Sequence, residues 1–471
     1  MRYISTRGEA PALDFVEVML AGLARDGGLY VPESWPALDP QTIAGFGGKP
    51  YAEVAVEVIK PFVGDSIAEP DLARMAREAY GTFRHPAVAP LVQLAPSLFV
   101  LELFHGPTLA FKDLAMQLLA RLMDHVLQRR GERTTIVVAT SGDTGGAAVE
   151  AFRGRDQVDV VVLFPHGRIS EVQRRMMTTA PDANVHALAI EGTFDDCQAL
   201  VKAMFNHHAF RDRVRLSGVN SINWARIVAQ AVYYFTAAVA LGGPHRKIAF
   251  TVPTGNFGDV YAGYVARRMG LPIDRLVVAT NVNDILARAF ATGAYELRDV
   301  VATTSPSMDI QVSSNFERLL FDAYDRDARA VRALMGSLAQ SRRFALSSHA
   351  LKAMRALFSA DRADEQECAA TIRAWMREAG YCADPHTAIA LAVAEKETRD
   401  PKVPMVVLST AHPAKFPDAV KASCGITPAL PDWLADLPKR AERVTVLPAD
   451  QAAVERFVAS AARAAREGAP A

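Results

Sequence analysis

The stretch that decides the fold reads His105-Gly106-Pro107-Thr108-Leu109-Ala110-Phe111-Lys112-Asp113. It follows an apolar run at residues 98–104 and leads into a helical pattern. Lys112 has apolar neighbours on both sides, and a lysine in such surroundings loses part of its hydration. Desolvation lowers the pKa of the amine and makes the amine a better nucleophile and base. Taken alone, the commoner explanation is a lysine whose charged end reaches water.

The composition is that of a large globular protein. The chain has 471 residues, of which 50% are hydrophobic and 22% charged, so we expect more than one subdomain. Lys plus Arg and Asp plus Glu both number 52, which argues against a nucleic-acid partner. No apolar run is long enough to span a membrane, and the N-terminus lacks a signal-peptide core. The four cysteines are far apart, which favours a reducing cytoplasm and gives no indication of a metal site.

Short apolar runs alternate with helical patterns after about residue 95. Most of the runs are rich in Val or Ile, which is typical of strands buried on both faces. This alternation predicts an α/β fold with two parallel-sheet subdomains and helices on both faces of each sheet. The predicted strands are residues 98–104, 135–139, 158–164, 185–190, 248–252, 276–280 and 405–409.

The same pattern divides the chain into segments. We expect an N-terminal subdomain (1–95), a smaller α/β subdomain (96–215), a larger α/β subdomain (216–324 and 381–430), a helical insertion without strands (325–380) and a C-terminal tail (431–471).

Parallel sheets bind ligands beyond the carboxyl ends of their strands, so the loops after the predicted strands are the candidates for a site. One such loop is Thr140-Ser141-Gly142-Asp143-Thr144-Gly145-Gly146. Its small residues let the backbone approach a ligand, and the helix that follows offers free N–H groups to a carboxylate. The alternative is an ordinary N-cap made by Ser141 or Asp143.

A second loop, Pro253-Thr254-Gly255-Asn256-Phe257-Gly258-Asp259, has two glycines before a helix. Backbone amides in such a loop can cradle a phosphate. It is neither a Walker loop nor a Gly-x-Gly-x-x-Gly dinucleotide loop. The alternative is a tight turn between a strand and a helix.

Two further segments offer polar and cationic groups. In Asn220-Ser221-Ile222-Asn223-Trp224-Ala225-Arg226, the last asparagine and the arginine lie on one helix face and suit a phosphate. In Ser409-Thr410-Ala411-His412-Pro413-Ala414-Lys415-Phe416, a neutral hydroxyl precedes a cation. The alternatives are a helix cap with a surface arginine, and a packed histidine with a solvated lysine.

Together these loops describe an activated lysine, a carboxylate loop, a phosphate cradle, a neutral hydroxyl and extra cations. A cofactor that has both an aldehyde and a phosphate is the simplest ligand that uses all of them. We therefore expect Lys112 to hold pyridoxal 5'-phosphate as a Schiff base.

These motifs resemble the threonine synthase family, in the branch of bacterial and fungal enzymes. The lysine motif, the segments 140–145, 220–226, 255–259 and 412–416, and also Gly27-Gly28-Leu29-Tyr30-Val31-Pro32 and Asp384-Pro385-His386-Thr387-Ala388, match in the family's order. The resemblance covers nearly the whole chain. It implies the tryptophan-synthase-β-like fold (fold type II) of pyridoxal-phosphate enzymes. It also implies a carbon–oxygen lyase activity that converts O-phospho-L-homoserine and water to L-threonine and phosphate.

The resemblance also implies roles for single residues, with the cofactor in the larger subdomain. Lys112 would be the catalytic residue. The cofactor phosphate would be held by Gly255, Asn256, Phe257 and Gly258, while Asp143 would lie near its phenolic oxygen and Thr410 would face its pyridine nitrogen. Ser141 and Thr144 would hold the substrate carboxylate. The candidates for the substrate phosphate are Asn220, Asn223, Arg226 and Lys415.

Three alternatives differ in function. A related phospholyase, which eliminates phosphate and releases 2-oxobutyrate, would share the lysine and the cofactor loops. A non-catalytic module with the same fold is disfavoured by the intact Lys112 and phosphate loop. A nicotinamide-dependent dehydrogenase is disfavoured by the missing glycine fingerprint. We expect a cytoplasmic monomer or homodimer with a small-molecule substrate, without membrane or nucleic-acid partners.

Overall fold

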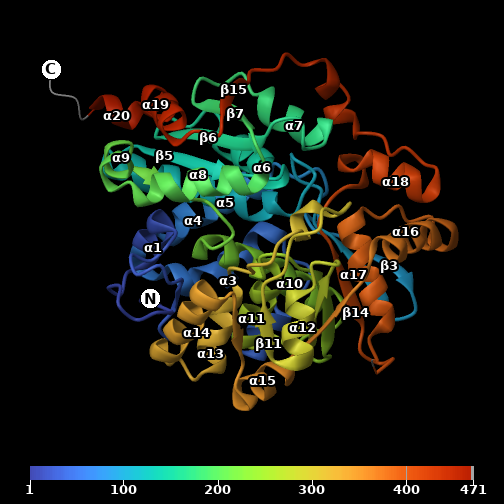
Figure 1. The fold of residues 1–471 in the computed structure, drawn as a ribbon. Coiled ribbons are helices and arrows are strands. Elements are labelled where there is room, and N and C mark those ends of the chain that lie inside the picture. The colour runs from blue at the N-terminus through green and yellow to red at the C-terminus, as the bar shows by residue number, and fades with distance from the viewer. Residues whose placement is uncertain (399, 468–471) are drawn as a thin grey trace.

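The structure is a computed structural model that describes residues 1–398 and 400–467. Two separate β-sheets form its frame (Figure 1). The larger sheet is built from β3 (Leu91–Ala95), β4 (Leu98–Glu102), β9 (Ile248–Pro253), β10 (Ile273–Thr280), β13 (Phe358–Arg362) and β14 (Met405–Ser409). Its order is β13-β10-β9-β14-β4-β3, and only β3 is antiparallel to its neighbour.

The smaller sheet is entirely parallel and has the order β15-β7-β6-β5-β8. Its strands are β5 (Thr134–Ala139), β6 (Val158–Pro165), β7 (Val185–Glu191), β8 (Leu216–Ser217) and β15 (Thr445–Pro448). Two antiparallel pairs stand apart: β1 (Tyr3–Ser5) with β2 (Tyr30–Pro32), and β11 (Ala294–Glu296) with β12 (Arg343–Ala345). The predicted α/β fold is confirmed, and each predicted strand is present.

Helices connect and cover the strands (Figure 1). They are α1 (Phe15–Ala21), α2 (Pro40–Ala44), α3 (Tyr51–Val63), α4 (Glu69–Tyr80), α5 (Lys112–Arg130), α6 (Asp143–Phe152), α7 (Glu171–Thr178), α8 (Phe194–Asn206), α9 (His208–Arg213), α10 (Trp224–Ala240), α11 (Gly258–Arg268), α12 (Ile285–Thr292), α13 (Phe316–Ala323), α14 (Ala328–Ser341), α15 (Ser348–Arg355), α16 (Glu365–Ala379), α17 (Pro385–Lys396), α18 (Pro417–Cys424), α19 (Gln451–Ala461) and α20 (Arg463–Glu467). Within the described residues, none of these helices combines the length and the apolar character that a membrane crossing requires.

Both faces of the central strands are buried, as the apolar runs predict. In β9, Phe250 and Val252 belong to the main core, which also contains Val138 of the smaller sheet. Ala249 points to the opposite face and packs with α17. Because one core includes residues of both sheets, the ends of their strands are held in a fixed relation to each other.

Several strands do not lie in the segments predicted for their sheets. β4 falls in the segment predicted for the smaller subdomain, but it pairs with β14 in the larger sheet. β13 falls in the predicted strandless insertion and pairs with β10, while β15 falls in the tail and pairs with β7. The local sequence does not show which strand is the neighbour of another in a sheet. The edge strands β13 and β15 also lack the buried apolar run that is typical of a central strand. The other boundaries stay predictions.

Trp224 fixes the N-terminal segment to α10. Its side chain is fully buried, and its ring centroid lies 5.8 Å from the rings of Tyr3 and Phe62 and 6.2 Å from that of Trp35. Aromatic side chains contribute more buried area than any others, so this contact is a main source of stability for the N-terminal segment.

We predict that Trp224→Ala lowers the free energy of unfolding by about 3–5 kcal/mol, because it leaves a cavity that the surrounding rings cannot fill. Urea denaturation followed by circular dichroism measures the change. Trp433→Ala is the matched control, because Trp433 is only half-buried and its loss should have a clearly smaller effect. Equal losses in the two variants would contradict this account of the core.

Candidate active site

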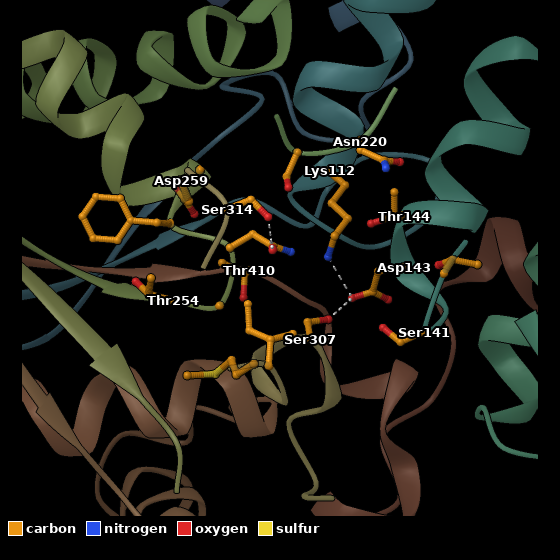
Figure 2. A pocket seen from close by; sticks show the side chains of 18 of the residues that line it. Lys112, Ser141, Asp143, Thr144, Asn220, Thr254, Asp259, Ser307, Ser314 and Thr410 are labelled. Carbon is orange, nitrogen blue, oxygen red and sulfur yellow. Dashed lines mark hydrogen bonds and ion pairs between the residues drawn. The ribbon is translucent and has the colours of Figure 1, made fainter. Parts of the chain in front are cut away.

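A cavity of about 230 Å³ lies where the loops after β5, β9 and β14 meet. Its lining includes Lys112 and Thr410 from the larger sheet's side and the segment 139–144 from the smaller sheet's side. Residues 306–314 close it from a region with little regular structure. Figure 2 shows the polar side chains of these loops gathered around the cavity. The loops that we singled out after predicted strands therefore converge on one site.

Lys112 begins α5 and is buried. Its Nζ lies 3.5 Å from Asp143 Oδ2 and 4.8 Å from the centre of the Phe111 ring. Burial lowers the pKa of the amine, Asp143 opposes this effect, and Lys415 and Arg226 lower the pKa further. A buried amine with a lowered pKa is suited to bind an aldehyde covalently and to exchange protons.

The loop before Lys112 is held by its own residues and by the loop after β14. The Asp113 carboxylate accepts hydrogen bonds from the amide (2.8 Å) and the hydroxyl (2.6 Å) of Thr108. The amide of Phe111 donates to the carbonyl oxygen of Thr410 at 2.8 Å. Thr410 is therefore fixed beside the lysine and lines the cavity (Figure 2).

Asp143 begins α6 and is buried between several donors. Its Oδ1 lies 2.7 Å from Lys415 Nζ and accepts a hydrogen bond from Gln173 at 3.0 Å. Burial by itself would raise the pKa of Asp143, but Lys415, Lys112 and His386 together hold it well below its usual range. The carboxyl is therefore ionised. Ser141 and Thr144, from the same loop, also line the cavity (Figure 2).

The loop before α11 has the form of an anion cradle. Phe257 adopts a left-handed conformation, with φ of 63°, directly before the helix begins at Gly258. The carbonyl oxygen of Gly255 accepts a hydrogen bond from Ser313 at 2.7 Å, and that of Asn256 accepts one from the amide of Asn315 at 3.0 Å. Because Ser313 and Asn315 bind these two carbonyl oxygens, the free backbone amides at the start of α11 are available to a phosphate.

Arg226 is a buried cation without a charged partner. Its Nη1 donates to the carbonyl oxygen of Val219 at 3.1 Å, and its Nε makes no hydrogen bond. In the described part of the chain, no carboxylate forms an ion pair with it, and burial lowers its pKa to about 10. Arg226 and Asn220 both line the cavity. A buried guanidinium with an unused donor facing a cavity fits an anionic ligand.

Two of the predicted ligands of the substrate phosphate do not line the cavity. Asn223 caps α10, where its side chain accepts from Ala225 and donates to the carbonyl oxygen of Met19 at 2.8 Å. Lys415 is fully buried and paired with Asp143. The structure therefore places both side chains outside the lining of the cavity, because each finds a partner elsewhere in the fold that the sequence pattern does not show.

His386 and Ser307, to which the sequence pattern gives no role, also line the cavity. Nδ1 of His386 lies 2.7 Å from Asp384 Oδ2, and its Nε2 accepts a hydrogen bond from the amide of Ser307 at 3.3 Å. The hydroxyl of Ser307 donates to Asp143 Oδ2 at 3.4 Å (Figure 2). The motif around Asp384 could have indicated His386. Ser307 lies in an irregular segment that has no such signal.

The residues present fit a cofactor with an aldehyde and a phosphate. Lys112 supplies the buried amine, and the cradle before α11 supplies the phosphate site. At Gly255 a side chain would lie too close to the carbonyl oxygen of Ser307, so the cradle accepts only glycine there. No group of three or more His, Cys, Asp or Glu residues in the described chain could hold a metal ion.

Comparisons with known proteins agree with a pyridoxal-phosphate cofactor. Residues 82–365 match the family model "Pyridoxal-phosphate dependent enzyme". Residues 2–80 match "Threonine synthase N terminus", and residues 387–458 match "Threonine synthase, C-terminal". The threonine synthase of Pseudomonas aeruginosa is 55% identical over 459 residues, which cover 97% of this chain and 98% of that one.

Solved structures of threonine synthases are also similar to this chain. The crystal structure of pyridoxal-phosphate-bound threonine synthase from Brucella melitensis has 62% identity and a TM-score of 0.96, and covers 98% of this chain and 100% of its own. The yeast threonine synthase structure has 38% identity and a TM-score of 0.92, with 98% of each chain covered.

We predict that Gly255→Ala weakens the binding of pyridoxal 5'-phosphate roughly tenfold or more, a loss of about 1.4 kcal/mol or more of binding free energy. The added methyl group would push the cradle away from Ser307. An absorbance titration of the apoenzyme measures the affinity. Gly336→Ala is the control, because an added Cβ at that position in α14 meets open space. A Gly255→Ala variant with unchanged affinity would show that the cradle does not hold the cofactor.

Proposed function

This chain belongs to the threonine synthase family, and we propose that it converts O-phospho-L-homoserine and water to L-threonine and inorganic phosphate. It is a pyridoxal-phosphate-dependent lyase of amino-acid biosynthesis. One observation supports the substrate most directly. The cavity that contains Lys112 offers two places for a phosphate: the cradle before α11 and the unpaired Arg226. A cofactor with one phosphate would occupy the cradle and leave Arg226 for the phosphate of the substrate.

The cofactor would be bound by residues from several loops. Lys112 would hold it covalently, residues 255–258 its phosphate and Thr410 its pyridine nitrogen. Asp143 would lie near its phenolic oxygen. When bound, the cofactor supplies an electron sink that stabilises negative charge on the carbon atoms next to the amino group of the substrate.

Lys112 is the residue to which we assign the proton transfers. Its amine would take protons from Cα and Cβ and return protons to Cγ and Cα, while phosphate leaves from Cγ. Water would add its hydroxyl group at Cβ, and its remaining proton would be taken up by the released phosphate. Burial lowers the pKa of this amine and so favours its neutral form, which can accept a proton. Asp143, 3.5 Å away, would stabilise the ammonium that forms.

The other loops would bind the substrate. Ser141 and Thr144 lie at the start of α6, where free helix amides can bind the carboxylate of the substrate. Arg226 and Asn220 would bind the substrate phosphate. Both anionic ends would then be fixed, and the carbon atoms between them would lie near Lys112.

The substrate is a small molecule, and the remaining statements on partners and location are proposals. We propose a monomer or homodimer without nucleic-acid or membrane partners. We also propose a cytoplasmic location. It is favoured by the four cysteines, which are all free.

We predict that Lys112→Ala abolishes the release of phosphate from O-phospho-L-homoserine and the visible-edge absorbance of the bound cofactor. The variant loses both the covalent attachment and the proton carrier. Phosphate release is measured together with threonine and 2-oxobutyrate. Lys202→Ala, a change of an exposed lysine, serves as the control. If the wild-type enzyme forms 2-oxobutyrate in place of threonine, the protein is the related phospholyase.

For Arg226→Met we predict an increase in KM for O-phospho-L-homoserine of roughly 30-fold or more, because hydrogen bonds to a charged group contribute about 2 kcal/mol. Methionine keeps most of the buried volume. Steady-state kinetics give KM. The matched comparison is the affinity for L-threonine, which lacks a phosphate and should bind both enzymes about equally. Unchanged KM and kcat would show that Arg226 does not bind the substrate phosphate.

A further inference from the structure

The two oxygens of the Asp143 carboxylate have different surroundings. Oδ1 is held tightly, by Lys415 at 2.7 Å and by Gln173 at 3.0 Å. Oδ2 makes only long contacts, to Lys112 at 3.5 Å and to Ser307 at 3.4 Å, and these two partners line the cavity (Figure 2). One oxygen is therefore anchored, while the other faces the reacting amine.

Lys415 is an unusual anchor, because it is a fully buried lysine. Besides the contact with Asp143, its Nζ donates to the carbonyl oxygen of Thr108 at 2.8 Å. Thr108 belongs to the loop before Lys112, and Asp143 begins α6 at the end of the smaller sheet. Lys415 thus joins the lysine loop to the smaller sheet's loop, and it does not line the cavity as described.

We propose that Lys415 is a positioning residue that anchors Oδ1 of Asp143 as a permanent counterion, so that Oδ2 stays directed at Lys112 throughout the reaction. The inference rests on the proposed function, because it requires that Lys112 binds the cofactor. When Lys112 does so, its nitrogen enters a covalent bond, and the charge that it presents to Asp143 would then change during the reaction. Lys415 takes no part in that chemistry and supplies the charge at every stage.

The charges around Lys112 fix the sign of the effect. Lys415 and Arg226 repel its ammonium and Asp143 attracts it, while Asp259 is a further charged group that interacts with Lys112. His386 faces Asp143. Removing Lys415 takes away one repelling charge and leaves Lys112 as the only lysine beside Asp143. Both changes favour the ammonium, so the amine should need a higher pH to become neutral.

The test is the rate at which the apoenzyme binds pyridoxal 5'-phosphate covalently, measured by absorbance between about pH 6 and 10. Only the neutral amine reacts, so the midpoint of the rate profile reports the protonation of Lys112. We expect Lys415→Met to raise the midpoint by about one pH unit or more, and to slow the reaction about tenfold at a pH below it. Asp143→Asn should move the midpoint in the opposite direction.

A double-variant cycle shows whether Lys415 acts through Asp143. The rise in midpoint caused by Lys415→Met should be larger when Asp143 is present than in an Asp143→Asn background, where only the direct repulsion is lost. Equal rises in the two backgrounds, or no rise in either, would overturn the proposal. Lys421→Met makes the same change at an exposed site on α18 and should leave the midpoint in place.

The experiment also distinguishes a folding defect of the variant and a failure of the proposed function from a failure of the role of Lys415. If Lys415→Met does not fold, Lys415→Gln removes the charge but keeps a hydrogen-bond donor, and the same comparison applies. If the wild-type apoenzyme forms no covalent adduct at Lys112 after borohydride treatment, the proposed function fails. If the wild type forms that adduct while the variants show no midpoint shift, only the role of Lys415 fails.

Discussion

Asp143 is an ionised carboxylate removed from water, and an ion in such a place is stable only when groups of opposite charge surround it. Here Lys415 lies against one oxygen and Lys112 near the other, and His386 adds to the favourable field. These groups come from four separate segments of the chain. The need to neutralise one buried charge therefore joins the lysine loop, the loop after β14, the start of α17 and the end of the smaller sheet.

The polarity of parallel strands makes this meeting possible. β5, β9 and β14 all end toward the same cavity, so the loops that follow them converge although about 270 residues separate the first from the last. The hydrophobic core that the two sheets share holds the ends of their strands in a fixed relative position. Helix starts then provide amides for anions: α6 beside Ser141 and Thr144, and α11 beside the cradle.

An irregular segment completes the site. Ser313 and Asn315 bind the carbonyl oxygens of the cradle from outside, and Ser307 contacts both His386 and Asp143. Asn281 and Asn283 hold the same segment through Asp309, at 2.7 and 3.1 Å. Loops positioned by a rigid scaffold commonly supply functional groups, and hydrogen bonds give this one its shape in place of helix or strand pairing.

The sequence by itself determined the elements and the chemistry. Runs of Val and Ile marked the central strands, because a strand buried on both faces must be apolar throughout. Lys112 and the glycine loop were recognisable because close approach and an unhydrated amine demand particular residue types. Only the tertiary structure determined which strands pair in a sheet and which side chains become partners. β4 joined the larger sheet, Asn223 became a helix cap and Lys415 became the partner of Asp143. A side chain's partners depend on residues distant in the chain, and a local pattern contains no information about which of them the fold brings near.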